Sequence, residues 1–337
     1  MPFITPFFSD GTVAEEFPAP FLDHWETLAL TTNQADPLSS APPWNLAIQK
    51  ISHPGQRLLY LENNSGILVL NERLVDDGLL FSLDDQWGFG SSLLGPDSPA
   101  LLAEALEMLA RLGTRVKRIF LGGVRPDSGF ADSLAMRLDP SFGIWWGHPL
   151  GAVGSASLEN GLDGWLGRRS ANTRAKLKKA RRKSAGAGIW FERVIPETPE
   201  AALKIYDRMI DVERRSWKGI GHCGMAEEPA IRFYRELLLM NGRQARVIFA
   251  KFGLLDIGFI FGNVLGRVYR GQQFSYDQGF AEFSLGNLMQ FETVSWLCET
   301  GCLRYGMGPV TGNDRMAYKS HWAEAATPYR ALHIFKR

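Results

Sequence analysis

The stretch VYRGQQFS, residues 268–275, runs directly into YDQGFAEFSLGN, residues 276–287, and together they decide the fold. The first segment is strand-forming, and the second is rich in glycine and polar side chains before a helical pattern over 284–300. A turn between a strand and a helix presents backbone N–H groups to anions, and the helix dipole adds to this preference. With LRYGMGPVTGNDRMAYKSHW at 303–322, this region is where we expect a phosphate-bearing donor to bind.

The composition is that of a globular protein of 337 residues, long enough for two domains. The net charge is +1, from 37 basic and 36 acidic side chains, so the whole molecule has no field that favours nucleic acid or membrane. Three cysteines are too few for a disulfide framework. The first residues lack the pattern of a signal peptide, and the uncharged run at 140–158 is broken by glycine and proline. We therefore expect a cytoplasmic protein without a membrane span.

Two halves of the chain share one order of predicted elements. Each begins with helices, continues with a three-strand meander bounded by turn residues, and ends with a helix, a strand, a short helix and a final strand. This order predicts an α+β (mixed α/β) fold of two lobes, each a mostly antiparallel sheet flanked by helices. The expected divisions are an N-terminal arm at 1–18, a first lobe at 19–158 and a second lobe at 159–337.

A run of positive charge marks the start of the second lobe. Residues 163–183 read as one helix, which carries nine Lys or Arg side chains, and no acidic residue lies between 164 and 191. One interpretation is a solvated helix face. The other is that part of the run faces a phosphate-bearing donor or a polyanion such as transfer RNA, whose binding would depend on salt. The sequence leaves both open.

Four segments of the second half carry a family resemblance. They are SANTRAKLKKARRK at 170–183, ERRSWKG at 213–219, YDQGFAEFSLGN at 276–287, and GMG at 306–308 with AYKSHW at 317–322. In this order, residues 162–322 resemble the acyltransferase domain of the GNAT superfamily found in the CelD-like group. That group is similar in its two-lobed layout to the Fem-type peptidoglycan aminoacyltransferases. The first lobe is similar to the family's degenerate N-terminal unit, which implies a non-catalytic role.

The resemblance implies where the donor binds. The donor would lie across the central strands of the second lobe, where two neighbouring strands separate, and the turn before the long helix would hold the pyrophosphate of acetyl-CoA or a longer acyl-CoA. The residues of this chain that match that turn are Gln278, Gly279, Ser284, Gly286 and Asn287. Two departures stand beside them. Leu285 replaces a proline that is usual in the group, and Arg304 replaces an aspartate, which implies a different acceptor.

Acyl transfer from a thioester to an amine needs a deprotonated nucleophile, a donor to the developing oxyanion and a proton for the leaving thiolate. The catalytic candidates are Asp277, Tyr305, Tyr318 and Lys319. The predicted substrate-binding residues are Trp217, Lys218, Tyr276 and Arg304. Each has a structural alternative, since Asp277 can cap the turn at Gly279 and each tyrosine can be a packed ring. No metal-ligand cluster emerges, and His222 with Cys223 is a poor nucleophile pair because no third group orients them.

The sequence thus predicts an N-acyltransferase that moves an acyl group from a thioester, most simply acyl-CoA, to an amine or hydroxyl of a small molecule or saccharide. An aminoacyl-tRNA-dependent transferase, which would use the charge run at 168–183, is the enzyme alternative. A binding protein on a GNAT scaffold that has lost its catalysis is the alternative from another class. Acyl length, acceptor and oligomeric state are not encoded in any recognisable motif.

Overall fold

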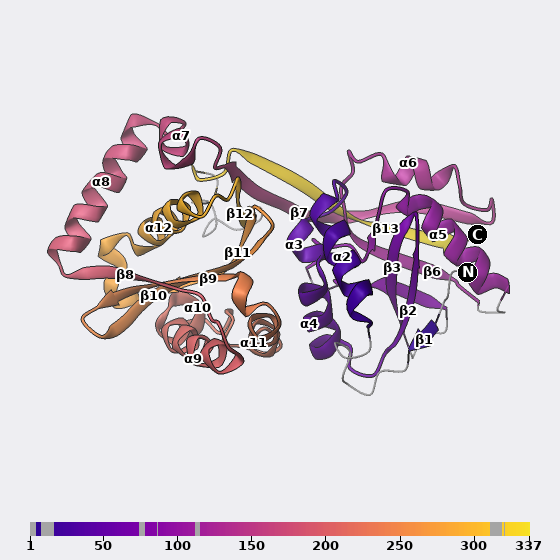
Figure 1. The fold of residues 1–337 in the computed structure, drawn as a ribbon, viewed down its shortest axis with the longest axis horizontal. Coiled ribbons are helices and arrows are strands. Elements are labelled where there is room, and N and C mark those ends of the chain that lie inside the picture. Colours follow the sequence, from indigo (N-terminus) through magenta and orange to yellow (C-terminus); the bar gives the residue numbers. More distant parts are fainter. Residues whose placement is uncertain are drawn as a thin grey trace. The chain divides into compact units, whose positions relative to one another are not determined.

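The computed structural model describes residues 5–7, 17–73, 78–85, 87–111, 115–310, 319 and 321–337. The predicted arm at 1–18 and the short helix expected around 314–322 lie largely outside these ranges. The chain divides into two compact units, which are coloured by sequence in Figure 1. Unit 1 comprises residues 1–152 and 327–337, and unit 2 comprises 153–326.

Unit 1 is a mostly antiparallel sheet with helices packed on it. Its strands follow the order β1-β2-β3-β4-β6-β13, and β5 pairs with β3. Of these neighbours only β4 and β6 are parallel. Its elements are β1 (Thr5–Phe7), α2 (Ala19–Thr31), α3 (Pro37–Ser40), α4 (Pro42–Ser52), β2 (Arg57–Asn63), β3 (Gly66–Glu72), β4 (Leu79–Ser82), β5 (Leu93–Leu94), α5 (Ser98–Arg111), β6 (Arg118–Val124), α6 (Phe130–Ala135), the first part of β7 (Phe142–Ser157) and most of β13 (Ala325–Lys336).

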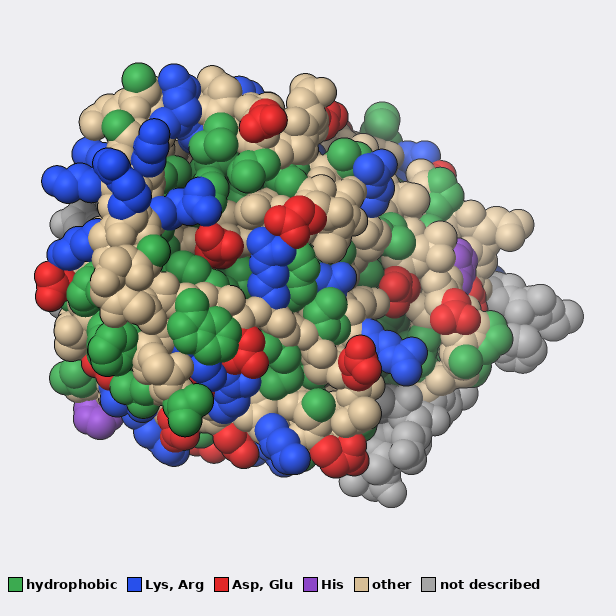
Figure 2. Space-filling view, turned by 60° about the vertical axis from the view of Figure 1, so that its left-hand side comes forward, with side chains coloured by type: hydrophobic (Ala, Val, Ile, Leu, Met, Phe, Trp, Pro, Cys, Tyr) green, Lys and Arg blue, Asp and Glu red, His purple; other side chains and the backbone are tan. Residues whose placement is uncertain are grey.

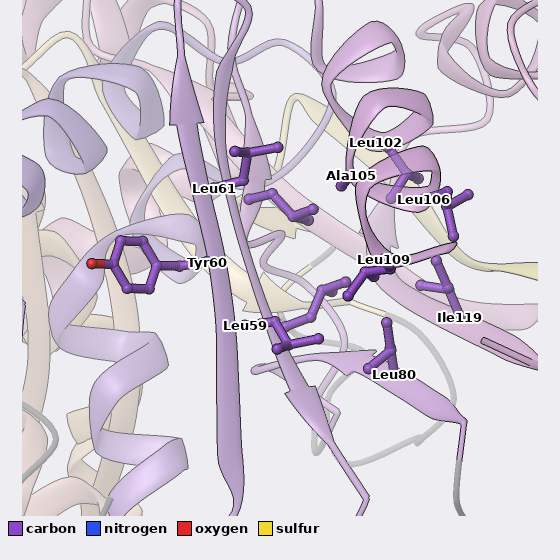
Figure 3. Close-up of a pocket in the computed structure, with 11 residues that line it drawn as sticks. Leu59, Tyr60, Leu61, Leu80, Leu102, Ala105, Leu106, Leu109 and Ile119 are labelled. Carbon is purple, nitrogen blue, oxygen red and sulfur yellow. The ribbon is translucent and has the colours of Figure 1, made fainter. Parts of the chain in front are cut away.

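The core of unit 1 lies between β2, β3 and α5. Figure 3 shows Leu59 and Leu61 pointing toward Leu102 and Leu106 of α5, whereas Tyr60 points to the other face of the strand. This alternation is what the two-residue period of a strand requires. The remaining cavity is only about 10 Å³, too small for an organic ligand. The core is therefore closed by side-chain packing.

Unit 2 has the sheet order β7-β12-β11-β10-β9-β8, in which only β11 and β12 are parallel. Figure 1 shows α12 and α9 on opposite faces of this sheet. Together with unit 1, this arrangement confirms the predicted mixed α/β class with mostly antiparallel strands. The elements are α7 (Gly161–Gly167), α8 (Ala171–Gly186), β8 (Ile189–Val194), α9 (Pro199–Arg215), α10 (Trp217–Ile220), α11 (Ala230–Met240), the 3₁₀ helix η1 (Gly242–Gln244), β9 (Ala245–Phe252), β10 (Leu255–Leu265), β11 (Val268–Tyr276), the 3₁₀ helix η2 (Gln278–Phe283), α12 (Leu285–Glu299) and β12 (Arg304–Pro309).

The basic run is two helices rather than one. The α7 helix ends at Gly167, and Ser170 then caps α8 by accepting a hydrogen bond from the Thr173 N–H at 3.1 Å. A serine in extended conformation satisfies an otherwise unpaired N–H and so begins a new helix. Arg168 and Arg169 both pair with Glu324; Arg169 is buried by this arrangement, whereas Arg168 remains exposed. The prediction of a single helix was wrong because the capping signal of Ser170 outweighs the continuous charge pattern.

Two strands differ from the expected layout. The aromatic strand predicted at 142–147 is the 16-residue β7, which passes from unit 1 into unit 2 between residues 152 and 153. The last strand, assigned by sequence to the second lobe, pairs with β6 of unit 1, so that Ile334 lies opposite Ile119. Local patterns identify a strand but not its partner, which explains both differences. Among the described residues, no helix combines the length and the apolarity needed to cross a bilayer.

Candidate active site

The parallel strands of unit 2 separate after a short paired segment. Val268, Tyr269 and Arg270 lie opposite Arg304, Tyr305 and Gly306. Beyond this point, among the residues that the structure describes, β11 pairs only with β10 and β12 pairs only with β7. Register shifts occur on both outer sides, in the β10–β11 and the β12–β7 ladders. Such bulges bend strands and place main-chain groups next to a site. The predicted region of strand separation is thus present in the centre of the sheet.

Lys319 lies at this separation. Its Nζ donates to the carbonyl oxygen of Pro309, the last residue of β12, at 2.9 Å. Burial, followed by the positive charges of Arg270 and Lys218, lowers the pKa of Lys319 to about 8. An amine with this pKa exchanges its proton near neutral pH, which an ordinary lysine does not do.

A buried polar network adjoins this amine. Lys218 is 8% exposed, and its Nζ contacts the Gln273 Oε1 at 2.9 Å and the Glu213 Oε1 at 3.4 Å. The Gln273 Nε2 donates to the Tyr234 hydroxyl at 2.8 Å. Burial lowers the pKa of Lys218, and the neighbouring Glu213 opposes that shift. The network fixes Lys218 and Gln273 on the α9 side of the separated strands.

Arg270 completes the positive cluster, and a glycine makes room for it. Gly308 has a φ of 74°, and a Cβ built there would lie 3.2 Å from the Arg270 Nη1. A side chain at 308 would therefore be strained and would crowd the guanidinium. Sequence reasoning missed four members of this cluster, namely Glu213, Tyr234, Arg270 and Gln273. Glu213 lies in the same quoted motif as its partner Lys218, whereas Tyr234, Arg270 and Gln273 come from α11 and β11, which are remote from that motif in sequence.

A groove of about 670 Å³ lies between α8 and the start of α12. Lysines of α8 and residues of the predicted pyrophosphate turn line this groove together, an arrangement that suits the second interpretation of the basic run, in which part of it faces a phosphate-bearing donor. The groove residues used below are Lys176, Lys179, Lys183, Ser284 and Asn287. Lys183 pairs with the Glu282 Oε2 at 2.7 Å, and Glu282 also lines the groove. Lys176 and Lys179 beside a helix N-terminus still form a surface that suits phosphate.

Some residues of the predicted turn line the groove, whereas others pack against the rest of unit 2. Ser284 and Asn287 line the groove, and the Asn287 Oδ1 also accepts from the Trp322 indole at 3.1 Å. Gly286 packs close to Phe274, since a Cβ there would lie 3.2 Å from the ring. Leu285 is fully buried in a core with Met289, so this departure from the family pattern anchors the helix by packing. Gln278 and Gly279 are exposed in η2 and do not line the groove.

Asp277 has a structural task in this arrangement. Its Oδ2 pairs with the Arg215 Nε at 2.8 Å, and its Oδ1 accepts from the Gly279 N–H at 2.9 Å. Arg215 and the turn N–H thus occupy both carboxylate oxygens, so Asp277 holds the turn, the structural alternative that its spacing from Gly279 allowed.

Tyr305 is buried in the core of unit 2, which does not suit its predicted role as a proton donor. It is 1% exposed, stacks on Tyr269 with ring centroids 5.4 Å apart, and donates its hydroxyl to Gln290. The ring belongs to the core of unit 2, where a leaving thiolate has no access. The structural alternative for this residue is therefore the one observed. Tyr318 lies outside the described residues.

The remaining predicted residues lie at different places. Lys218 is in the network above, and Trp217 is half-buried beside it at the start of α10. Arg304 is exposed at the start of β12, where its Nη2 donates to Ser155 Oγ at 3.2 Å, so it lies at the far end of the paired segment from Gly306. Tyr276 ends β11 in the core that contains Leu285. Of the substrate-binding candidates, only Lys218 directly contacts the cluster at the separation.

In the described part of the chain, no side chains are arranged as a cysteine nucleophile site or as a metal site. Cys223 is exposed, and the neighbouring His222 has its Nδ1 3.2 Å from Glu227 Oε1. Burial raises the pKa of Cys298 and of Cys302, so both thiols stay protonated. Nowhere in the described ranges do three His, Cys, Asp or Glu side chains gather as metal ligands.

A comparison with known protein families matches the part of the chain that contains the separated strands β11 and β12 and the helix α12. Residues 171–320 match the family described as an acetyltransferase (GNAT) domain. Residues 171–320 are therefore similar to a GNAT acetyltransferase domain. The match contains the four motifs noted in the sequence, apart from residues 170, 321 and 322 at their outer ends. It supports an acyltransferase as the general class. A search of curated proteins found no match.

Solved structures extend the likeness to the whole chain. A conserved protein of unknown function from Bacteroides thetaiotaomicron is 12% identical, with a TM-score of 0.66, over 98% of this chain and all of the other. FemX is 12% identical, with a TM-score of 0.63, over 92% and 95%. L-PGS from Bacillus licheniformis is 12% identical, with a TM-score of 0.52, over 99% and 95%. At these identities the likeness establishes the fold, and the narrower CelD-like assignment stays a prediction.

Proposed function

We propose that this chain is an N-acyltransferase that moves an acyl group from acyl-CoA to an amine of a small molecule or saccharide. One observation carries the proposal. Strands β11 and β12 separate beside an amine, that of Lys319, whose pKa is lowered to about 8. A thioester placed in that separation would have its carbonyl at main-chain N–H groups and its sulfur near a proton donor.

The donor's phosphates would bind in the groove between α8 and α12. Lys176 and Lys179 supply positive charge, Lys183 is paired with Glu282, and the start of α12 supplies the positive end of a helix dipole. Lysine ammonium groups act as point charges and suit phosphates without demanding one geometry. The pantetheine arm would then run from the groove toward the separated strands.

Lys319 would move the proton that the reaction has to transfer. The amine of the acceptor attacks the thioester carbon, forming a C–N bond, and the C–S bond breaks as the tetrahedral intermediate collapses. The Lys319 ammonium gives its proton to the leaving thiolate, and the resulting neutral amine takes the excess proton from the acylated nitrogen. Charge and protons balance without a covalent enzyme intermediate.

The positive cluster would also shape the choice of acceptor. Lys218 and Arg270 lie on the α9 side, with Gln273 between hydrogen-bonding partners. A cluster of this charge disfavours a cationic acceptor and favours a neutral amine or hydroxyl whose molecule also carries an anionic group. Arg304, at the other end of the paired segment, is no longer the first candidate for that contact.

The test begins with binding and continues with turnover. Acetyl-CoA and longer acyl-CoAs should raise the Tm by several degrees at concentrations well above Kd. Release of free thiol in the presence of a panel of amines then reports transfer. Failure of every acyl length to shift the Tm would overturn the proposal of a CoA donor.

An aminoacyl-tRNA donor is the second candidate, favoured by the exposed cations of α8. It predicts binding of charged transfer RNA that weakens steeply with salt, together with an absence of any acyl-CoA effect. Acyl-CoA binding without thiol release for any acceptor would favour a binding protein instead.

A further inference from the structure

An unusual apolar tip lies at the β9–β10 turn of unit 2. Leu254 is 96% exposed, and Leu255, Phe252 and Trp190 around it are 47–48% exposed. We call these four residues the apolar tip. Exposed large side chains are ordinary when scattered, but a contiguous group indicates a contact surface.

The apolar tip is continuous with the basic helix α8. Phe252 lies 5.6 Å from Phe280, and Phe280 lies 6.3 Å from Phe283, measured between ring centroids. The Lys183 ammonium sits 4.9 Å over the Phe283 ring. A row of phenyl rings thus joins the tip to the C-terminal end of α8.

The outer face of α8 is strongly positive. Lys178 and Arg182 are exposed and one turn apart, and within the described residues neither forms an ion pair. No acidic side chain occurs between 164 and 191 to offset them. Figure 2 shows Lys and Arg side chains gathered at the upper left, above a group of hydrophobic ones.

We propose that the apolar tip and the outer face of α8 together dock this protein on an anionic lipid surface. A bilayer interface takes up leucine and aromatic side chains, while its anionic headgroups attract lysine and arginine next to them. Nucleic acid would account for the charge but not for Leu254. A protein partner would account for the tip but gives no reason for a run of cations beside it.

Docking does not depend on the proposed catalysis. The groove faces Lys176 and Lys183 of α8, whereas the docking surface uses Lys178 and Arg182, so the two sets can be changed separately. The tip lies on the hairpin β9–β10, away from Lys319 in the chain and outside the lining of the groove.

Vesicle co-sedimentation of the full chain tests the proposal. Phosphatidylcholine vesicles with about 30% phosphatidylglycerol should bind the protein, and phosphatidylcholine alone should bind at least about tenfold less. Lys178→Glu with Arg182→Glu should lower the partition coefficient at least about tenfold, and Leu254→Ser with Leu255→Ser should lower it severalfold. Raising the salt from about 0.1 M to about 0.5 M should weaken binding of the wild-type protein.

Matched controls separate docking from general changes. Lys204→Glu with Arg235→Glu removes two exposed cations from α9 and α11, and Ile220→Ser removes an exposed apolar side chain from α10. These controls should bind vesicles like the wild type. The docking variants should keep their Tm and their response to CoA. Equal binding to neutral and anionic vesicles, no binding to either, or loss of RNA binding rather than vesicle binding in the charge variant would each overturn the proposal.

Discussion

In the described part of the chain, units 1 and 2 each contain one parallel strand pair, three residues long. The space beyond that pair is occupied differently in the two units. In unit 1, Leu79 to Phe81 lie opposite Arg118 to Phe120, and in unit 2, Val268 to Arg270 lie opposite Arg304 to Gly306. Beyond the pair in unit 2 lie charged side chains. Beyond the pair in unit 1 lies the main chain of residues 84, 85 and 87–90.

That loop of unit 1 is packed directly against β6. A Cβ on Gly122 would lie 2.8 Å from the Asp84 carbonyl oxygen, and one on Gly123 would lie 2.6 Å from that of Gly90. The Asp84 carboxylate, itself fully buried, secures the loop by accepting from the indole of Trp44 and from four backbone N–H groups, those of Trp87, Gly88, Phe89 and Gly90.

The same strand arrangement is thus filled by the protein's own loop in unit 1 and surrounds a candidate active site in unit 2. In unit 1 the Asp84 carboxylate pairs with four backbone N–H groups of the loop, which stabilises the fold, and the main chain of the loop occupies the space next to β6. In unit 2 the separation holds Lys319 and Lys218 at lowered pKa, which is unfavourable for stability but useful for chemistry. The following substitutions test that contrast.

Lys319→Arg should have the largest effect, a loss of about 100-fold or more in kcat. Arginine keeps the positive charge but does not release a proton near neutral pH. The wild-type rate of the step that needs the ammonium should fall as the pH rises through about 8, the pKa of Lys319. The measurement is thiol release against pH, with acyl-CoA binding followed separately.

The exposed Lys204 of α9 provides the control, because Lys204→Arg changes the same side chain away from the site. Near-normal turnover by Lys319→Arg would show that charge alone is needed and would remove the proton-transfer role.

Asp84→Asn should lower the free energy of unfolding of unit 1 by about 3 kcal/mol. An amide oxygen replaces only one of two acceptors, so buried N–H groups of the loop lose their partner. Thermal unfolding and kcat per folded molecule are to be measured together, and kcat should not change. Asp85→Asn is the control, since Asp85 is only partly buried and pairs with His53 at 2.8 Å. A comparable loss in both variants would contradict the special role of Asp84.

Lys319→Met should make unit 2 more stable at pH 7, by about 1–2 kcal/mol or a few degrees in Tm. The folded pKa of about 8 lies below the usual 10.5, so the folded state disfavours the charged amine. The gain should be complete below pH 8 and should fade between pH 8 and about 10.5, where the unfolded chain also loses the proton. A gain that does not vary with pH would point to packing instead.

Lys176→Glu should raise the Kd of CoA about tenfold and flatten its salt dependence, because the groove loses one cation and gains an anion. Lys178→Glu changes the same charge on the outer face of α8 and should leave the Kd within about twofold. Calorimetry at two salt concentrations gives both values. Equal weakening in the two variants would mean that α8 acts only through its overall charge.

Tyr305→Phe should have the smallest effect, with kcat within about twofold and a loss of stability of about 1 kcal/mol from the unpaired Gln290. Tyr234→Phe is its counterpart, because that hydroxyl accepts from Gln273 beside Lys218. We expect this second change to lower turnover more. A large fall in kcat for Tyr305→Phe would restore the phenol as a proton donor.

Sequence reasoning recovered the features that depend on neighbours along the chain. The strand at 268–276, the turn at 277–283 and the helix that follows all form nearly as predicted, because apolar periodicity and glycine act locally. The family resemblance, and not local periodicity, singled out Ser284 and Asn287; both line the groove, and their role in donor binding stays a prediction. Even the alternative task of Asp277, capping Gly279, was visible in the spacing of two residues.

Features that depend on distant pairing were missed. Lys218 and Gln273 are 55 positions apart and meet only because β11 folds against α10, so no motif links them. The ring of Tyr305 was assigned to chemistry because residue type does not tell which face of a strand is buried. The partner of β13 was assigned to the wrong lobe, since its apolar alternation suits either sheet.

The route of the chain through β7 and β13 has a consequence for synthesis. Most of unit 1 is synthesised first, but its strand β13, residues 325–336, is synthesised last. Residues 153–324 of unit 2 have all been synthesised before β13. The ends of that inner segment meet where the Glu324 N–H donates to the Ser155 carbonyl oxygen at 2.8 Å. During translation, unit 2 can therefore fold before unit 1 is complete. Until β13 is synthesised, β6 of unit 1 is an exposed sheet edge on the nascent polypeptide.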